Sequence, residues 1–430
     1  MKKIILTFLA ITASVSAYTA DWTFTPKLYV RGGFTQSTDL RAKGDGFDSN
    51  GSTPFNAQSY NQTNAFQPNL TEFDLYADIK DKARIVYGVN IDKNERFELN
   101  GAANNDHNGL PKERQAYIEF YNAIGKDGTL WFGRRPYRGF GDLMDGTFPL
   151  DERNLFGGGV MLDKVGIGRW EVAYAVNEDP NTPNTNDVFT TNMLLNKYII
   201  GIDDGNITFN GEVHQNNSLK DEYKSYGYMI GGQYARWNMS IFDSKLYNIF
   251  VLNYSHGHLG DVEAGEMASA FDSKKKNEQA QRFTFKIGGD LKNKAWATYY
   301  TIKYQNHMGD KQDANGYTQR GQNWQFTDFM LRPMYALTSH VGVGIDGFAR
   351  LIMRDTTVDS PSSWAKDQDV WRLAAVASYH LDPGAENIFQ TAEVSVLAGR
   401  IHHDKETTYF KGHKASKDAD FIRFKYTMQI

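Results

Sequence analysis

The chain of 430 residues is 40% hydrophobic and 23% charged, a composition typical of folded rather than disordered proteins. Its net charge of −4, without any block of like charges, argues against a nucleic-acid partner. It has no cysteine, so an exported protein of this kind must be held by packing and hydrogen bonds alone. Beyond the N-terminal segment no run approaches the roughly 18 apolar residues of a transmembrane helix. A mean hydropathy of −0.55 nevertheless suits a β-barrel with a wet lumen as well as a water-soluble protein.

The first residues, MKKIILTFLAITASVSA, have the pattern of a secretory signal peptide. Lys2 and Lys3 form the basic end, residues 4–11 the apolar stretch, and Val15 to Ala17 a small-residue cleavage site. A retained membrane anchor is the competing interpretation, but the apolar run is too short to span a bilayer. We therefore expect a signal peptide over 1–17 and one domain over 18–430, with a cut after Ala20 as the alternative.

Polar and apolar residues alternate repeatedly along the rest of the chain. In TEFDLYADIK (71–80), three carboxylates and a phenol alternate with four apolar side chains. Side chains on a strand alternate between faces, so this segment has one polar and one apolar side. In a membrane barrel, Asp74 and Asp78 would face a water-filled channel, and Phe73 and Ile79 would face lipid. The same alternation predicts strands over 27–34, 83–92, 169–179, 206–214, 282–290, 340–350 and 421–430.

The connections between these segments fall into two length classes. Polar inserts over 41–64, 177–187 and 255–281 are too long for hairpin turns, whereas 80–83 and 123–129 read as tight turns. Long loops at one end and short turns at the other are typical of outer-membrane barrels. The length suits about 16 to 18 membrane strands, and an even, closed set leaves no unpaired edge in lipid.

A secreted β-sandwich or β-helix with glycan-binding or hydrolase activity is the alternative from a different class. The C-terminus argues against it, because Phe424, Tyr426, Met428 and Ile430 alternate to the last residue as in outer-membrane chains, although the usual terminal aromatic is replaced by Ile430. We therefore expect an all-β transmembrane antiparallel barrel in the outer membrane of a Gram-negative bacterium.

Two segments carry a resemblance to the maltoporin family of carbohydrate-selective porins. They are LWFGRRPYRGFGDLMDGTFPLDERNLFGGGV (130–160), with its Trp-x-Gly-[KR]-Arg-x-Tyr unit, and FTDFMLRPMYALTSH (326–340), with its Arg-Pro-Met-Tyr unit. The resemblance implies a barrel of 18 strands, usually a homotrimer, whose third loop, here 136–157, folds inward as a constriction. It also implies passive sugar diffusion over a ladder of aromatic rings flanked by charged side chains. Flat C–H faces of sugars suit such rings, and their hydroxyls suit carboxylates and guanidiniums.

Specific residues can be carried over from the family pattern. Tyr29 and Tyr76 match ladder tyrosines and lie on the polar faces of their predicted strands, Phe326 matches a ladder tryptophan, and Phe250 matches a ladder phenylalanine. The polar-track and constriction positions fall on Arg31, Asp78, Arg114, Arg138, Asp142 and Asp145. Each of these side chains could instead be wall packing, and the arginines could be ion-paired with Asp74 or Asp78.

The chain also departs from the family. The ladder tryptophan near the C-terminus falls on Gln429, the second-loop tryptophan has no counterpart in 100–112, and the first-loop disulfide is absent. Shorter or different sugars, or a general diffusion porin without a sugar site, are therefore the runner-up predictions. The partners expected are oligosaccharides, outer-membrane lipid or lipopolysaccharide, and two further copies of the chain.

Other chemistry has weaker support in the sequence. The adjacent histidines of HHDKE (402–406) point to opposite faces of a strand, which disfavours a shared metal. Oxygen donors in 179–187 have spacings that could hold calcium, but two prolines favour an ordinary exposed loop. No nucleophile, base and orienting group converge in the pattern, so neither an enzyme nor a cofactor is predicted.

Overall fold

A computed structural model describes the strands and most of their short connections. The described residues are 22–37, 69–93, 112–137, 153–179, 189–217, 225–257, 259, 281–308, 324–354, 369–381, 393–403, 407–408, 414–415 and 418–429. The expected signal peptide lies outside them. The strands are β1 (Trp22–Ser37), β2 (Asn69–Ile79), β3 (Ala83–Lys93), β4 (Lys112–Phe120), β5 (Gly128–Tyr137), β6 (Arg153–Val165), β7 (Gly168–Asp179), β8 (Phe189–Ile202), β9 (Gly205–Asn217), β10 (Ser225–Ile241), β11 (Ser244–Gly257), β12 (Gln281–Lys292), β13 (Trp296–Met308), β14 (Trp324–Ala336), β15 (Val341–Arg354), β16 (Val370–His380), β17 (Glu393–His403), β18 (Thr407–Thr408), β19 (Lys414–Ala415) and β20 (Asp418–Gln429).

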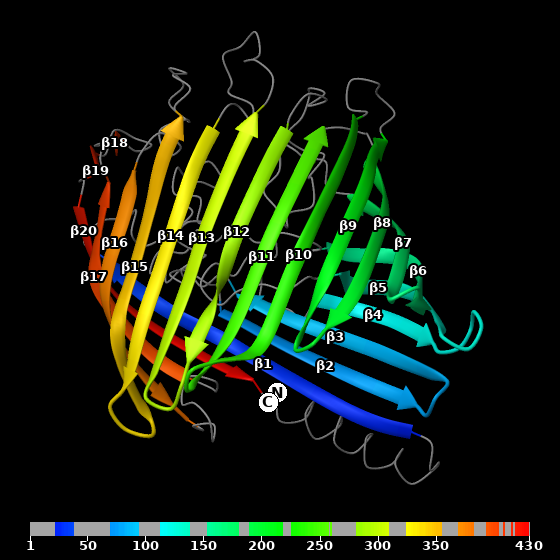
Figure 1. Ribbon diagram of the computed structural model, residues 1–430, viewed down its shortest axis with the longest axis horizontal. Coiled ribbons are helices and arrows are strands. Elements are labelled where there is room, and N and C mark those ends of the chain that lie inside the picture. The colour runs from blue at the N-terminus through cyan, green and yellow to red at the C-terminus, as the bar shows by residue number, and fades with distance from the viewer. Residues whose placement is uncertain are drawn as a thin grey trace.

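Eighteen of these strands form one closed antiparallel sheet. Each of β1 to β17 pairs with its neighbour in the chain, β17 pairs with β20, and β20 pairs with β1 to close the ring (Figure 1). The two remaining strands, β18 and β19, pair only with each other. The structure therefore confirms the predicted all-β barrel and rules out the sandwich and the β-helix.

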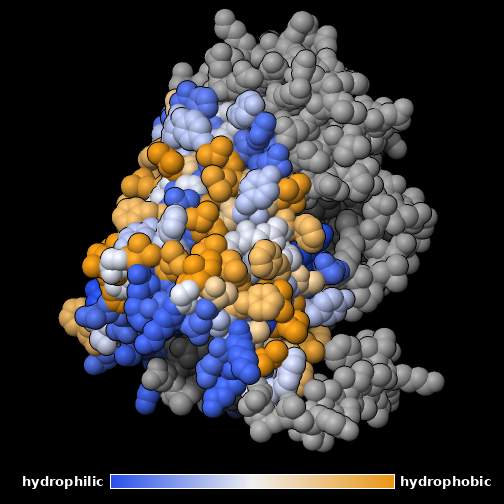
Figure 2. Space-filling view, turned by 90° about the vertical axis from the view of Figure 1, so that its right-hand side faces the viewer, coloured by the Kyte–Doolittle hydropathy of each residue, from blue (hydrophilic) through white to orange (hydrophobic). Residues whose placement is uncertain are grey.

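Side chains alternate between the inner and outer faces of this barrel, except where the register shifts at a bulge. In β16, buried and exposed residues alternate without interruption, with Arg372 and Ala374 inward and Trp371 and Leu373 outward. Large apolar side chains such as Trp170 and Phe209 are exposed on the outer face. Figure 2 shows apolar residues gathered over the middle of one outer face, with hydrophilic residues above and below them. The expected channel-facing and lipid-facing residues of β2 follow this pattern, with Asp74 buried on the inner side.

The strand connections alternate between short and long as the sequence predicts, except that the β16–β17 connection (381–392) is longer than the other short ones. The β2–β3 and β4–β5 turns occupy the two segments expected to be tight, and the β8–β9 turn is shorter than either. Asp81 and Asp204 adopt positive φ angles of 56° and 51° in these turns, a conformation that aspartate tolerates better than most residues. Short turns occupy the lower end of the barrel in Figure 1, which is the periplasmic end in outer-membrane barrels. Within the described residues, no helix is long and apolar enough to cross a membrane.

Candidate functional site

The polar face of β2 lies on the inner wall and is paired with cations from β3 and β4. The Arg114 guanidinium contacts Asp74 and lies 3.5 Å from the Glu72 carboxylate, while Arg84 Nε donates a hydrogen bond to Asp78 Oδ1 at 2.7 Å. Arg84 and Asp78 keep 39% and 27% of their side-chain surface exposed, so this pair is accessible. The first stretch of the wall therefore presents alternating positive and negative groups.

One bulge in the sheet and one glycine beside it create this arrangement. A bulge between Gly88 and Val89 leaves Arg114 without a partner in the β3–β4 register. Strict alternation would place Arg114 and Gln115 on opposite faces, but both lie beside Asp74, because a bulge re-aims the side chains around it. Gly88 is also required here, since a Cβ at this position would lie 2.1 Å from Asp74 Oδ1 and 2.7 Å from Gln115 Cγ.

Aromatic rings stand next to these charges, each accompanied by a cation. Lys27 Nζ lies 4.7 Å from the centre of the Tyr76 ring, and the Arg84 guanidinium carbon lies 5.8 Å from it. Arg135 lies 5.5 Å from the Tyr117 ring and 5.3 Å from the Trp131 ring. Cations at such distances are attracted by the ring quadrupole.

Strand register places these groups in two adjacent rows across β2 to β5. One row contains Tyr76, Val86 and Tyr117 at paired positions. The next contains Asp78, Arg84, Glu119 and Trp131, and Arg135 Nη2 reaches Glu119 Oε1 at 3.2 Å. We call Tyr76, Tyr117, Arg84, Asp78 and Arg135 the aromatic-charged strip. Trp131 is fully buried, and its ring packs against the Arg135 guanidinium.

The wall formed by β14 to β20 is built differently, around buried ion pairs. Asp328 accepts two hydrogen bonds from Arg350, at 2.6 and 2.7 Å, and its side chain is completely buried. Asp346 is equally buried and is shared by Arg332, at 2.6 Å, and by Arg372. An apolar cluster surrounds these groups and comprises Ala297, Tyr299, Met330, Met334, Phe348, Val370, Ala374, Val376, Leu397, Ile401 and Phe421.

The structure changes the interpretation of two predicted ladder residues. Phe326 faces inward but is only 1% exposed, and the Arg350 guanidinium lies 4.1 Å from the centre of its ring. Phe250 faces outward, whereas a ladder ring in the lumen would have to face inward. Its neighbours Ile249 and Val251 are the fully buried inward residues, and its ring packs edge-on against Phe285 at 5.3 Å. The alternation of β11 fixes this orientation.

The other predicted site residues fall into three groups. Tyr29 is half-buried and pairs in register with Glu72 and Gln429, on the same face as the aromatic-charged strip. Arg31 lies in β1 opposite Leu70 and Thr427. The expected constriction residues Arg138, Asp142 and Asp145 lie outside the described residues, as does most of the predicted third loop.

Sequence reasoning missed four members of this neighbourhood, namely Arg84, Tyr117, Glu119 and Arg135. One of them had a signal, because Arg135 lies inside the Trp-x-Gly-[KR]-Arg-x-Tyr unit. Arg84 could have been identified because it lies across the predicted tight turn 80–83 from Asp78. Glu119 becomes evident only from the register with Arg84 and Trp131. Among the described residues, no three His, Asp or Glu side chains form a group that could hold a metal ion.

A closed 18-stranded barrel with an apolar outer belt and a charged inner wall defines a channel protein of the outer membrane. The family model described as LamB porin matches residues 17–374. The chain therefore belongs to the LamB porin family, and the predicted resemblance is confirmed at the level of a porin. Porins are channels rather than enzymes, which agrees with the sequence-based prediction.

Solved porin structures resemble the chain over most of its length at low identity. OprD of Pseudomonas aeruginosa has a TM-score of 0.47 at 10% identity and covers 95% of both chains. A BenF-like porin from Pseudomonas fluorescens Pf-5 has a TM-score of 0.48 at 10% identity, covering 95% of this chain and 99% of its own. OccK2 (OpdF) of P. aeruginosa has a TM-score of 0.47 at 9% identity, covering 95% of this chain and 97% of its own. No curated protein matches the sequence.

Proposed function

We propose that this porin conducts sugars by passive diffusion and binds them weakly on the aromatic-charged strip. The observation that carries the proposal is the adjacency of Tyr76 and Tyr117 to both guanidiniums and carboxylates on one inner face. A sugar ring can stack its C–H face on a phenol while its hydroxyls bond the flanking charges. Weak binding at successive positions lets a solute enter and leave.

Tyr29 extends this strip toward the long-connection end. It pairs with Glu72, which lies on the same face as Asp74 and Tyr76, and successive inward positions on a strand are about 7 Å apart. Arg31, Arg138, Asp142 and Asp145 remain predicted contributors from the family pattern. The direction along Tyr29 and Tyr76 is thus the predicted path of the sugar.

Planar-bilayer conductance tests the proposal directly. Maltooligosaccharides, sucrose and unrelated disaccharides are titrated against the purified channel, and saturable block of ion current reports binding. Tyr76→Ala should weaken the block by up to about tenfold, because one aromatic contact is removed. Tyr87→Ala is the matched control, since Tyr87 is a tyrosine of the adjacent strand that is 45% exposed on the outer face. Equal block in Tyr76→Ala and Tyr87→Ala would refute the strip as the binding surface.

A general diffusion porin is the second candidate, and one observation favours it. Phe326 is buried under Arg350 and Phe250 faces outward, so two expected ladder rings are missing from the accessible wall. A channel of this kind would show ohmic conductance that no sugar alters. The same titration of the unsubstituted protein separates the two candidates.

The expected partners belong to the same proposal. The apolar outer band supports contact with outer-membrane lipid, and the family resemblance supports a homotrimer. Light scattering of the detergent-solubilised protein, corrected for bound detergent, measures the number of copies. A monomeric mass would contradict the trimer and leave the channel itself unaffected.

A further inference from the structure

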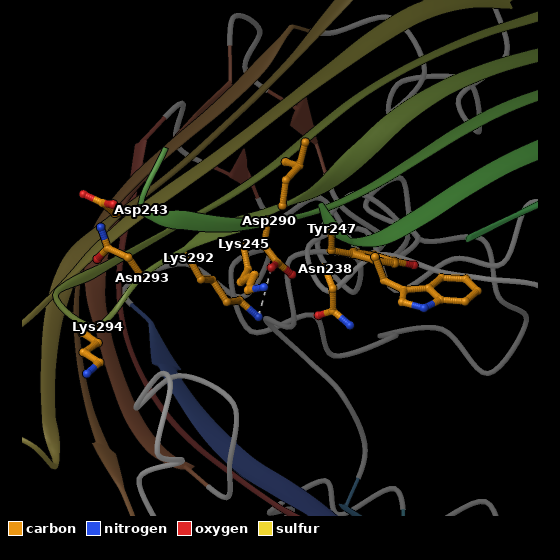
Figure 3. Close-up of a pocket in the computed structure, with 10 residues that line it drawn as sticks. Asn238, Asp243, Lys245, Tyr247, Asp290, Lys292, Asn293 and Lys294 are labelled. Atoms are coloured by element: carbon orange, nitrogen blue, oxygen red, sulfur yellow. Dashed lines mark ion pairs between the residues drawn. The ribbon is translucent and has the colours of Figure 1, made fainter. Parts of the chain in front are cut away.

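A cavity of about 420 Å³ lies at the short-turn end of the barrel, between β10, β11, β12 and the β12–β13 turn. This volume is within the range of small-molecule sites. Figure 3 shows Lys245, Lys292, Asp290, Tyr247 and Asn238 lying close together, whereas Asp243 and Lys294 lie farther toward the turns. Trp237 also lines the cavity and adds a second aromatic ring. The cavity is therefore both aromatic and charged.

Lysines outnumber carboxylates among the residues that line this cavity. Lys245 and Lys292 are directly opposite each other in the β11–β12 register, and like charges at such positions are destabilising. Asp290 is already engaged by Lys292, with Oδ1 and Nζ 3.1 Å apart. Lys245 is exposed, and its Nζ donates a hydrogen bond to Ser240 Oγ at 3.4 Å, a neutral acceptor. An anionic group between the two ammonium groups would relieve this repulsion.

Neighbouring positions fix the cavity on the inner wall. Asp290 and Tyr299 occupy paired, buried positions on β12 and β13, and Lys292 Nζ lies 5.1 Å from the centre of the Tyr299 ring. Tyr247 pairs with Asp290 and lies on the same face. A solute leaving the lumen at the short-turn end therefore passes this cavity.

We propose that the cavity is an exit subsite for sugars that carry a negative group, either a carboxylate or a phosphate. Lys245 and Lys292 would bind the anionic group through charge-assisted hydrogen bonds, and Tyr247 and Trp237 would contact the sugar ring. This subsite deepens the proposed sugar channel, because it selects acidic sugars at the periplasmic mouth. Its binding chemistry requires no contribution from the aromatic-charged strip.

Calorimetric titration of the full-length channel in detergent tests this subsite. The probes are glucuronate, glucose 6-phosphate and neutral glucose, and the variants are Lys245→Gln and Lys164→Gln. Lys164 is a matched control, because it is exposed at the short-turn end on another hairpin and pairs with Asp127 at 2.7 Å. We expect one or both anionic sugars to bind more tightly than glucose, and Lys245→Gln to weaken that binding about tenfold. Lys164→Gln should leave it unchanged.

The outcomes separate this subsite from the sugar channel as a whole. Binding of glucuronate alone or of glucose 6-phosphate alone supports the subsite and identifies its anionic group. Equal affinity for glucose and both anions, or equal loss in Lys245→Gln and Lys164→Gln, would overturn it. If maltooligosaccharides do not block the unsubstituted channel while anionic sugars still bind, the proposed strip is refuted and the subsite remains intact. Heat-dependent gel migration of each variant confirms that the barrel is folded.

Discussion

Two parts of the inner wall, β2 to β5 and β14 to β20, contain the same residue types but bury them to different degrees. On β2 to β5, aromatic rings lie beside ion pairs that keep part of their surface exposed, such as Arg84 and Asp78 at 39% and 27%. On β14 to β20, the acids Asp328 and Asp346 are completely buried between arginines. A charge near water remains available to a solute, whereas a buried pair is committed to its partner. By this contrast, the wall of β2 to β5 is our proposed binding wall, and the wall of β14 to β20 is structural.

The largest effect should come from the buried wall. Asp346→Asn removes the negative charge that two buried guanidiniums share. We expect a loss of about 5 kcal/mol in the free energy of unfolding, measured by urea titration in detergent. Asp78→Asn is the control, because Asp78 and Arg84 form an accessible pair at 2.7 Å on the wall of β2 to β5. Equal urea midpoints of unfolding for the two variants would contradict the contrast between the walls.

Phe326→Ala should lower stability by about 3 kcal/mol, since it truncates a large buried side chain beneath Arg350. The sugar affinity of the channel should change little, because this ring is not accessible to a solute. Urea titration and conductance block are measured on the same preparation. A strong loss of block with unchanged stability would restore Phe326 to the sugar ladder.

Tyr117→Ala should weaken saturable sugar block by up to about tenfold while the barrel remains folded. The reason is that Tyr117 is an accessible ring on the inner wall with Arg135 beside it. Tyr174→Ala provides the control on the outer face, where Tyr174 is 53% exposed and donates a hydrogen bond to Asn192 Oδ1. If sugar blocked the current through the two variants equally, the proposed binding wall would not include β4.

Phe250→Ala should have the smallest effect on transport. Its ring lies on the outer face against Phe285, away from the lumen, so block by maltooligosaccharides should match that of the unsubstituted channel. The measurement is the same conductance titration. A clear loss of block would show that Phe250 reaches the solute after all.

Much of the fold was predictable because strand alternation and connection length are local properties of the sequence. The polar face of β2 and the tight turns at 80–83 and 123–129 follow directly from residue order. The sequence offered an ion pair between Arg114 and Asp74 as an alternative, and the structure contains it, but the bulge opposite Gly88 that places Arg114 there was not predictable. The burial of Phe326 depends on Arg350, which lies on the next strand and reaches its ring only in the folded sheet.

Pairing between β1 and β20 brings Tyr29 next to Gln429, positions at opposite ends of the domain. The barrel cannot close until the last strand has been made, so closure follows completion of the chain. Until then β1 and the newest strand expose unpaired backbone groups, which template pairing with other chains. Contacts this distant in sequence also form slowly. The unclosed chain is therefore prone to aggregate, and removal of residues 418–429 should convert a membrane channel into an aggregating polypeptide.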